Sequence, residues 1–299
     1  MAVNHFPGGE WPTMLTPFRD GAVDYPALEA LVEWYIAHGV SGLFAVCQSS
    51  EMFFLSLEAR FVNEKAAGRV PVIASGHISD SFEDQVHELT AMTGTGVDAV
   101  ILITNRLAKE EESDEVWLAN LQALLDKLPS QVPLGFYECP YPYKRVLSPK
   151  VTRWCAESGR FFFLKDTCCD IQQIKEKLDI CRDSNLKLYN ANTSTLLESL
   201  RYGATGYSGV MANMQCDLYA WLCAHPQDEK AEELSQELTI CSLIERQLYP
   251  VNAKYYLSLE GLSITTECRS KRAEDLTPTF RTEVEMLRQI TKRMADKYL

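Results

Sequence analysis

The segment Phe161-Phe162-Phe163-Leu164-Lys165-Asp166 decides the expected fold of this chain. Four large apolar residues in succession are typical of a strand that is buried on both faces, as in a parallel sheet covered by helices. Lys165 ends this strand, although a buried ammonium group is costly unless it is paired or neutral. Desolvation lowers the pKa of a lysine, and a neutral amine can attack a ketone to form a Schiff base. The alternative is that Lys165 only ends the strand and extends its ammonium group to water.

The rest of the chain repeats the same unit of apolar strand and amphipathic helix. The strands are expected at residues 11–15, 42–47, 70–74, 97–104, 133–137, 161–165, 186–190 and 206–208. Helices are expected at 28–38, 117–128, 171–180 and 194–201, and further helices are expected to begin at Ser56, at Ser81 with a capping box, and at Ser148-Pro149. Eight strands that alternate with helices predict an α/β fold, the (β/α)8 TIM barrel.

The last third of the chain has a different pattern, because strands no longer alternate with helices there. Helices are expected at 218–223, 232–248, 253–260 and 278–297. We therefore predict two parts: a barrel over residues 1–213 that carries the active site, and a C-terminal helical extension over 214–299 that packs on the barrel.

Composition excludes several classes of function. The 299 residues carry a net charge of −12 with a pI near 5.0, so nucleic acid is not an expected partner. No apolar run is long enough to cross a bilayer, and the polar residues of the first ten positions argue against a signal peptide. The ten cysteines match no zinc-binding spacing. We expect reduced cysteines and a cytoplasmic location.

Two strand ends carry residues that suit one reaction. In barrels of this kind the active site lies at the carboxyl ends of the strands, where Tyr137 and Lys165 end neighbouring strands about 5 Å apart. The amine can form an iminium on a 2-keto acid, and the phenol can move the proton. The alternative for Tyr137 is an ordinary half-buried strand tyrosine. The strand ends show no cluster of metal ligands, and His77 alone among the five histidines lies near one, so no metal is expected.

Four segments resemble the pyruvate-dependent class I aldolases, a family that includes N-acetylneuraminate lyase and dihydrodipicolinate synthase. They are Leu15-Thr16-Pro17-Phe18 with Gly21-Ala22-Val23-Asp24, then Tyr137-Glu138-Cys139-Pro140, Leu164-Lys165-Asp166-Thr167, and Gly203-Ala204-Thr205-Gly206 with Asn213. The resemblance runs almost from end to end. It implies that Lys165 forms the Schiff base, that Tyr137 relays protons, and that no cofactor is needed because the lysine is the electron sink. It also implies a homo-oligomer, a dimer or a tetramer.

The chain departs from the family at four places. Its loop after the second strand reads Cys47-Gln48-Ser49-Ser50-Glu51, where Gln48 replaces a hydroxyl that assists proton relay in the synthases. The tyrosine that the synthases place after strand four is absent from Thr104-Asn105-Arg106-Leu107, and Pro142 aligns with their arginine. The acidic residues with which sialic-acid lyases hold the sugar correspond here to Asn192, Thr193 and Ser194. The residues expected to bind substrate are Gln48, Ser49, Ser50, Thr167, Asn192, Ser208 and Gly209.

These observations predict a Schiff-base-forming lyase, an aldolase or dehydratase, that acts on a 2-keto acid such as pyruvate or a 2-keto-3-deoxy sugar acid. Dihydrodipicolinate synthase is the first alternative. The second is a non-catalytic keto-acid sensor that keeps the pocket without a working proton relay. The cations Arg106, Lys144 and Arg145 either line the mouth of the pocket or lie on the solvated surface.

Overall fold

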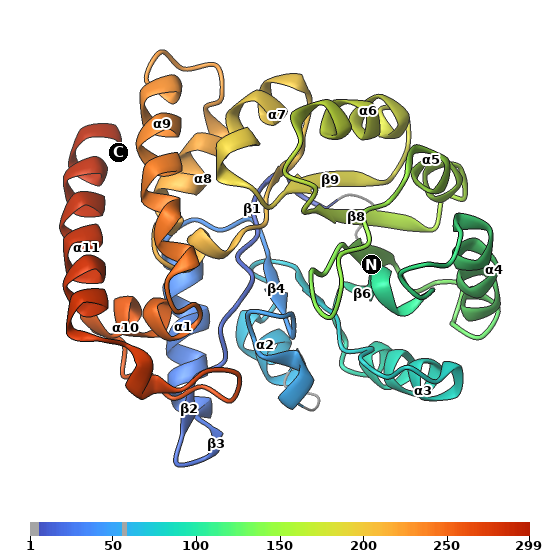
Figure 1. Ribbon diagram of the computed structural model, residues 1–299, viewed down its shortest axis with the longest axis horizontal. Coiled ribbons are helices and arrows are strands. Elements are labelled where there is room, and N and C mark those ends of the chain that lie inside the picture. The colour runs from blue at the N-terminus through green and yellow to red at the C-terminus, as the bar shows by residue number, and fades with distance from the viewer. Residues whose placement is uncertain (1–5, 56–58) are drawn as a thin grey trace.

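The structure, a computed structural model, describes residues 6–55 and 59–299. Ser56, where a short helix is expected to begin, lies outside the described residues. The described residues form one eight-stranded parallel sheet that curls around a central axis with helices outside it (Figure 1). Its strands are β1 (Gly9–Glu10), β4 (Leu43–Ala45), β5 (Val72–Ala74), β6 (Ala99–Ile103), β7 (Leu134–Tyr137), β8 (Phe161–Asp166), β9 (Lys187–Asn190) and β10 (Gly206–Tyr207). The predicted barrel class is confirmed.

The first strand closes the barrel in a way that differs from the prediction at 11–15. The ladder to β10 uses only Gly9 and Glu10, and a separate bridge joins Thr13 to Phe44 of β4. The two pairings are with different strands, and Pro12 faces β4 but has no N–H group to donate to it. The carbonyl of Pro12 still accepts the N–H of Phe44 at 3.1 Å, which completes the ring.

A short hairpin that was not predicted follows this closing segment. It pairs β2 (Phe18–Arg19) with β3 (Ala22–Val23) in antiparallel order. Asp20 and Gly21 form its turn with φ angles of 52° and 78°. An Asp-Gly pair is a strong signal for a two-residue hairpin turn, so the sequence contained the information.

The helices outside the sheet follow the predicted pattern. They are α1 (Tyr25–Ala37), α2 (Ala59–Ala66), α3 (Phe82–Thr93), α4 (Asp114–Leu125), α5 (Pro149–Glu157), α6 (Ile171–Cys181) and α7 (Leu196–Tyr202). Both predicted N-caps are confirmed, because Ser81 accepts the N–H of Asp84 and Ser148 accepts the N–H of Val151, each at 3.2 Å. Short 3-10 helices η1 (Met52–Phe54), η2 (Thr104–Arg106), η3 (Thr193–Thr195) and η4 (Val210–Asn213) follow four strand ends.

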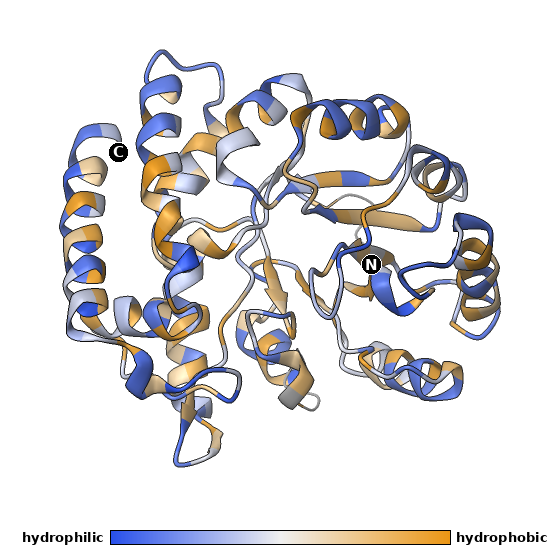
Figure 2. Ribbon diagram, in the orientation of Figure 1, coloured by the Kyte–Doolittle hydropathy of each residue, from blue (hydrophilic) through white to orange (hydrophobic). Residues whose placement is uncertain are grey.

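Aromatic rings fill the middle of the barrel. Phe163 stacks on Tyr189 with ring centroids 4.1 Å apart, and Trp11 meets Phe163 edge to face at 5.3 Å. Phe44 also contacts Phe163. Side chains alternate along a strand, so Phe163 and Lys165 share the inner face of β8, and the lysine lies above the aromatic layer. Figure 2 shows apolar strands at the centre and helices whose polar faces point outward.

The C-terminal helices lie side by side along one flank of the barrel (Figure 1). They are α8 (Cys216–Ala224), α9 (Ala231–Cys241), α10 (Val251–Leu259) and α11 (Pro278–Tyr298), with η5 (Ser242–Arg246) and η6 (Ala273–Asp275) between them. α8 packs on β1, and α11 packs on α8, α9 and α10. The helix expected at 232–248 is interrupted after Cys241, where the Ser242 hydroxyl donates to the carbonyl of Thr239 and competes with the helical pattern. The boundary at 213/214 stays a prediction.

None of the helices within the described residues is both long and apolar enough to pass through a bilayer.

Candidate active site

Lys165 and Tyr137 face each other at the carboxyl end of the barrel. They are direct partners across the β7–β8 ladder. The Lys165 side chain is buried, and its Nζ lies 4.5 Å from the centroid of the Tyr137 ring and 5.8 Å from that of Phe44. Burial lowers the pKa of Lys165 to about 8, against smaller opposing effects of Cys47, Cys139 and Glu245. A neutral amine is therefore accessible near physiological pH.

Gln48 completes the contact between the two strand ends and the loop after β4. The hydroxyl of Tyr137 donates to Gln48 Oε1 at 3.2 Å, and Sγ of Cys139 donates to the same oxygen at 3.6 Å. Burial raises the pKa of Tyr137 well above its ordinary value, so the phenol keeps its proton. The predicted residues Gln48, Tyr137 and Lys165 thus lie together.

The loop after β4 is a tight turn that its own serines stabilise. Val46 and Glu51 have φ angles of 47° and 63°, a region that β-branched residues such as valine rarely adopt. The Ser50 hydroxyl donates to the carbonyl of Met14 at 2.6 Å, and the Ser49 hydroxyl donates to Oγ1 of Thr13 at 3.2 Å. Both hydroxyl protons are thus used to hold the turn. Among the described residues, nothing accepts the backbone N–H groups of Gln48 and Ser49.

The other residues predicted to bind substrate, Thr167, Asn192, Ser208 and Gly209, differ from one another in their contacts. Thr167 donates its hydroxyl to the carbonyl of Glu138 at 2.7 Å, and Asn192 Oδ1 accepts the N–H of Thr195 at 3.2 Å, which caps η3. Ser208 is fully buried, and no group among the described residues bonds its hydroxyl. At Gly209 a Cβ atom would lie 2.2 Å from Oη of Tyr207, so no larger residue fits.

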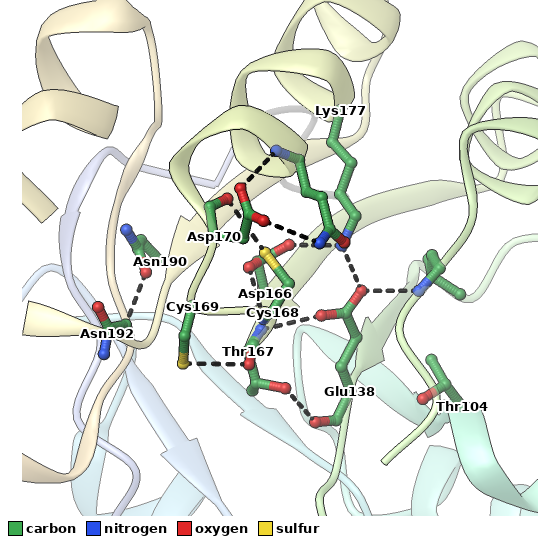
Figure 3. Close-up of polar contacts among 12 residues, drawn as sticks. Thr104, Glu138, Asp166, Thr167, Cys168, Cys169, Asp170, Lys177, Asn190 and Asn192 are labelled. Atoms are coloured by element: carbon green, nitrogen blue, oxygen red, sulfur yellow. Dashed lines mark hydrogen bonds and ion pairs between the residues drawn. The ribbon is translucent and has the colours of Figure 1, made fainter. Parts of the chain in front are cut away.

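Sequence reasoning missed two buried groups of charges next to these residues. Lys177 of α6 binds Glu138 and Asp166, the residues that directly follow Tyr137 and Lys165 (Figure 3). Glu51, at the end of the β4 loop, pairs with Lys254 of α10 at 2.9 Å. A signal for Lys177 was present, because Ile174, Lys177, Leu178 and Cys181 share the buried face of α6.

His77 and the cations Arg106, Lys144 and Arg145 were expected either near the pocket or on the surface. Each of them contacts other parts of the protein. His77 is buried, with Nδ1 3.3 Å from Oε1 of Gln85 and Nε2 accepting the N–H of Ile103. Burial lowers the pKa of His77 to about 3, so the ring is neutral. Arg106 pairs with Asp80, and Arg145 pairs with Asp114. Lys144 alone of the three cations donates to the loop after β8, at the carbonyl of Thr167.

Within the described residues, no three histidine, cysteine or carboxylate side chains gather closely enough to hold a metal ion.

The fold and this site together have the features expected of a Schiff-base-forming class I aldolase. Residues 7–290 match the dihydrodipicolinate synthetase family. The 4-hydroxy-tetrahydrodipicolinate synthase of Cereibacter sphaeroides is 30% identical over 263 residues, which cover 85% of this chain and 89% of that protein. The chain belongs to the dihydrodipicolinate synthetase family, and the predicted family and lyase class are confirmed.

Solved structures agree on the fold. The dihydrodipicolinate synthase of Thermotoga maritima superposes with a TM-score of 0.85 at 18% identity, over 96% of this chain and 99% of that one. The chloride-inhibited synthase of Acinetobacter baumannii, complexed with pyruvate, gives a TM-score of 0.84 at 24% identity, over 95% of this chain and 99% of that one.

Proposed function

We propose that the amine of Lys165 forms a Schiff base with the ketone of pyruvate or of another 2-keto acid, and that the chain needs no cofactor. The observation that carries this proposal is a buried lysine without a carboxylate partner among the described residues, packed over Tyr137 at a strand end. Its lowered pKa supports the neutral form that attacks a carbonyl.

Tyr137 supplies the proton in this mechanism. The amine adds to the C2 carbonyl, and the carbinolamine loses its hydroxyl as water when a proton reaches that oxygen. Tyr137 gives its proton to the departing hydroxyl. The resulting iminium accepts the electron pair of the C3–C4 bond as that bond breaks, which leaves an enamine, while the C4 hydroxyl passes its proton to the Tyr137 oxygen and becomes the aldehyde. A proton then adds to C3, and water hydrolyses the iminium to release the keto acid and the free amine. Gln48 Oε1 accepts from the phenol and so orients it, but an amide oxygen does not pass the proton on.

The turn after β4 supports binding of the keto acid's carboxylate. The backbone N–H groups of Gln48 and Ser49 have no acceptor among the described residues. Hydrogen bonds from N–H groups to a carboxylate are stronger than those between neutral partners. The serine hydroxyls, which are already donating inside the turn, contribute by holding its shape.

We favour a hydroxyl-rich aldehyde as the second half of the substrate, as in a 2-keto-3-deoxy sugar acid. Glu245 of η5 is half-buried, has no hydrogen-bond or ion-pair partner among the described residues, and acts electrostatically on Lys165. Its carboxylate can accept hydroxyl groups but repels a second anionic group. The alternative is 4-hydroxy-tetrahydrodipicolinate synthase, supported by the names of the relatives and by the positive charge of Lys144 beside the β8 loop.

The decisive experiment is borohydride reduction with pyruvate, followed by intact mass and peptide mapping. We expect a stable pyruvyl adduct on Lys165 and none on Lys165→Ala. Enzyme that has not been treated with borohydride is then assayed for cleavage of 2-keto-3-deoxy sugar acids and, in parallel, for condensation of pyruvate with aspartate semialdehyde coupled to a reductase. An adduct elsewhere would refute the role of Lys165. An adduct without turnover in either assay would favour the keto-acid sensor.

We also propose a homo-oligomer, a dimer or a tetramer, in the cytoplasm. Large apolar side chains of the C-terminal helical segment are exposed, among them Ile240 at 69% and Met286 at 56%. Contact with a second copy would remove them from water. All ten cysteines are free, which suits a reducing compartment. Light scattering at micromolar concentration tests the assembly, and the mass of one chain would contradict it.

A further inference from the structure

The two proposed catalytic residues are each followed directly by a buried acid. Glu138 follows Tyr137 and Asp166 follows Lys165, and both carboxylates are fully buried. Because side chains alternate across a strand, these carboxylates point away from the pocket, toward the helices outside the barrel. There they meet one cation, Lys177 of α6, whose Nζ lies 2.6 Å from Glu138 Oε1 and 2.5 Å from Asp166 Oδ2 (Figure 3).

Every hydrogen-bond partner of the two carboxylates within the described residues is a donor. Besides Lys177, Glu138 accepts the N–H groups of Leu147 and Thr167, each at 2.9 Å, and Asp166 accepts the N–H of Cys168 at 3.0 Å. Burial alone would lower the pKa of Lys177, but the charges of Glu138 and Asp166 outweigh it and raise that pKa above its usual range. The lysine is therefore held in its charged form.

Hydrogen bonds also join Glu138 to the backbone at and after Lys165. The N–H of Glu138 donates to the carbonyl of Lys165 at 3.3 Å, and the Thr167 hydroxyl donates to the carbonyl of Glu138 at 2.7 Å. The carboxylate of Glu138 also holds the N–H of Thr167. The end of β7 is thus fixed to the end of β8 at the level of the two residues that face the substrate.

We propose that Lys177 is a positioning residue, which holds the strand ends that carry Tyr137 and Lys165 in the register that the reaction needs. This inference rests on the proposed function. A buried ion pair is weak evidence of net stabilisation, because desolvation offsets the attraction of the charges. Its placement directly behind both reacting side chains favours a role in their geometry.

Removal of the ammonium group has a definite consequence. Two carboxylate oxygens that share one nitrogen lie no more than about 5 Å apart. Without Lys177, one of them must bind a proton, or the strand ends must separate. Separation moves Tyr137 relative to Lys165, and a misplacement of about 1 Å can lower a rate by about 100-fold.

The test compares Lys177→Met with Lys175→Met on the same helix. Lys175 makes a more exposed pair with Glu198 on the outer surface and provides the matched control. We measure the rate of borohydride-trapped adduct formation on Lys165, per folded molecule, as a function of pyruvate concentration. For Lys177→Met we expect a fall of at least about tenfold in the saturating rate, with the half-saturating pyruvate concentration within about threefold. Lys175→Met should match the native enzyme.

A Lys177→Met enzyme that is less stable yet traps pyruvate at the native saturating rate would overturn the proposal. If that variant does not fold, Glu138→Gln decides, because an amide cannot accept on both sides as the carboxylate does and must turn its NH2 group toward another donor. The same tenfold criterion applies to it. A native enzyme that forms no adduct would instead refute the proposed function, so the two failures are distinguishable.

Discussion

The lowered pKa of Lys165 makes a quantitative prediction about Schiff-base formation. With a pKa of about 8, roughly one Lys165 side chain in ten is neutral at pH 7. A lysine with the ordinary pKa of 10.5 would be neutral in about one molecule in 3,000. Burial therefore increases the reactive fraction by about 300-fold. The rate of imine formation should rise about tenfold per pH unit below pH 8 and reach a plateau above it.

The assay is the initial rate of pyruvate trapping between pH 6 and pH 10, quantified by mass on the Lys165 peptide. Burial raises the pKa values of Tyr137 and Cys139, so neither group should distort the profile below pH 9. Glu245→Gln removes a negative charge that raises the pKa of Lys165, and its midpoint should shift to lower pH by less than about one unit. A midpoint near 10.5, or a rate that does not depend on pH, would refute the argument that burial activates the amine.

Three further predictions concern single side chains. Lys165→Met should stabilise the protein at pH 7 by up to about 3 kcal/mol, because the folded pKa lies about 2.5 units below the unfolded value; this gain should be complete below pH 8 and absent above pH 10.5 in urea unfolding. Tyr137→Phe should still trap pyruvate while turnover falls about 10²- to 10⁴-fold, which a steady-state assay of the active substrate measures. Glu10 is fully buried, and burial raises its pKa, so the native state holds a proton that the unfolded state releases and loses stability as the pH rises above about 4.5. The Glu10→Gln variant has no such proton to lose. Its free energy of unfolding, relative to that of the native protein, should therefore increase by more than about 1 kcal/mol from pH 5 to pH 8.

The barrel could be predicted because its signal is repeated eight times. Apolar runs of strand length alternate with helical periodicity, and that alternation survives errors of a few residues at each strand end. The pairing of Tyr137 with Lys165 followed from their positions at consecutive strand ends, and the ladder makes them direct partners. The first strand was misplaced because its ladder to β10 involves only Gly9 and Glu10 and a single bridge at Thr13 joins it to β4, which apolar patterning does not reveal.

The burial of Glu138 and Asp166 could not be predicted, because acidic residues at the end of a strand usually lie in water. Glu138 and Asp166 are buried together with Lys177, which lies on α6, the helix that follows β8. That contact depends on tertiary packing. The contacts of the Ser49 and Ser50 hydroxyls could not be predicted either. Their hydroxyls face Thr13 and Met14, and a sequence does not show which way a loop side chain turns.

The ion pair of Glu51 bears on the order in which this protein becomes functional during synthesis. The Glu51 carboxylate accepts Lys254 Nζ at 2.9 Å and the N–H groups of Arg269 and Ser270 at 2.6 and 2.7 Å, partners that lie 203, 218 and 219 residues further along the chain. When the last of the eight strands has been synthesised, the groups that bind this carboxylate beside the β4 turn have not yet left the ribosome. The nascent barrel therefore carries this charge beside the β4 turn without its partners until residues 254–270 emerge. Binding competence should arrive late in translation, well after the sheet has closed.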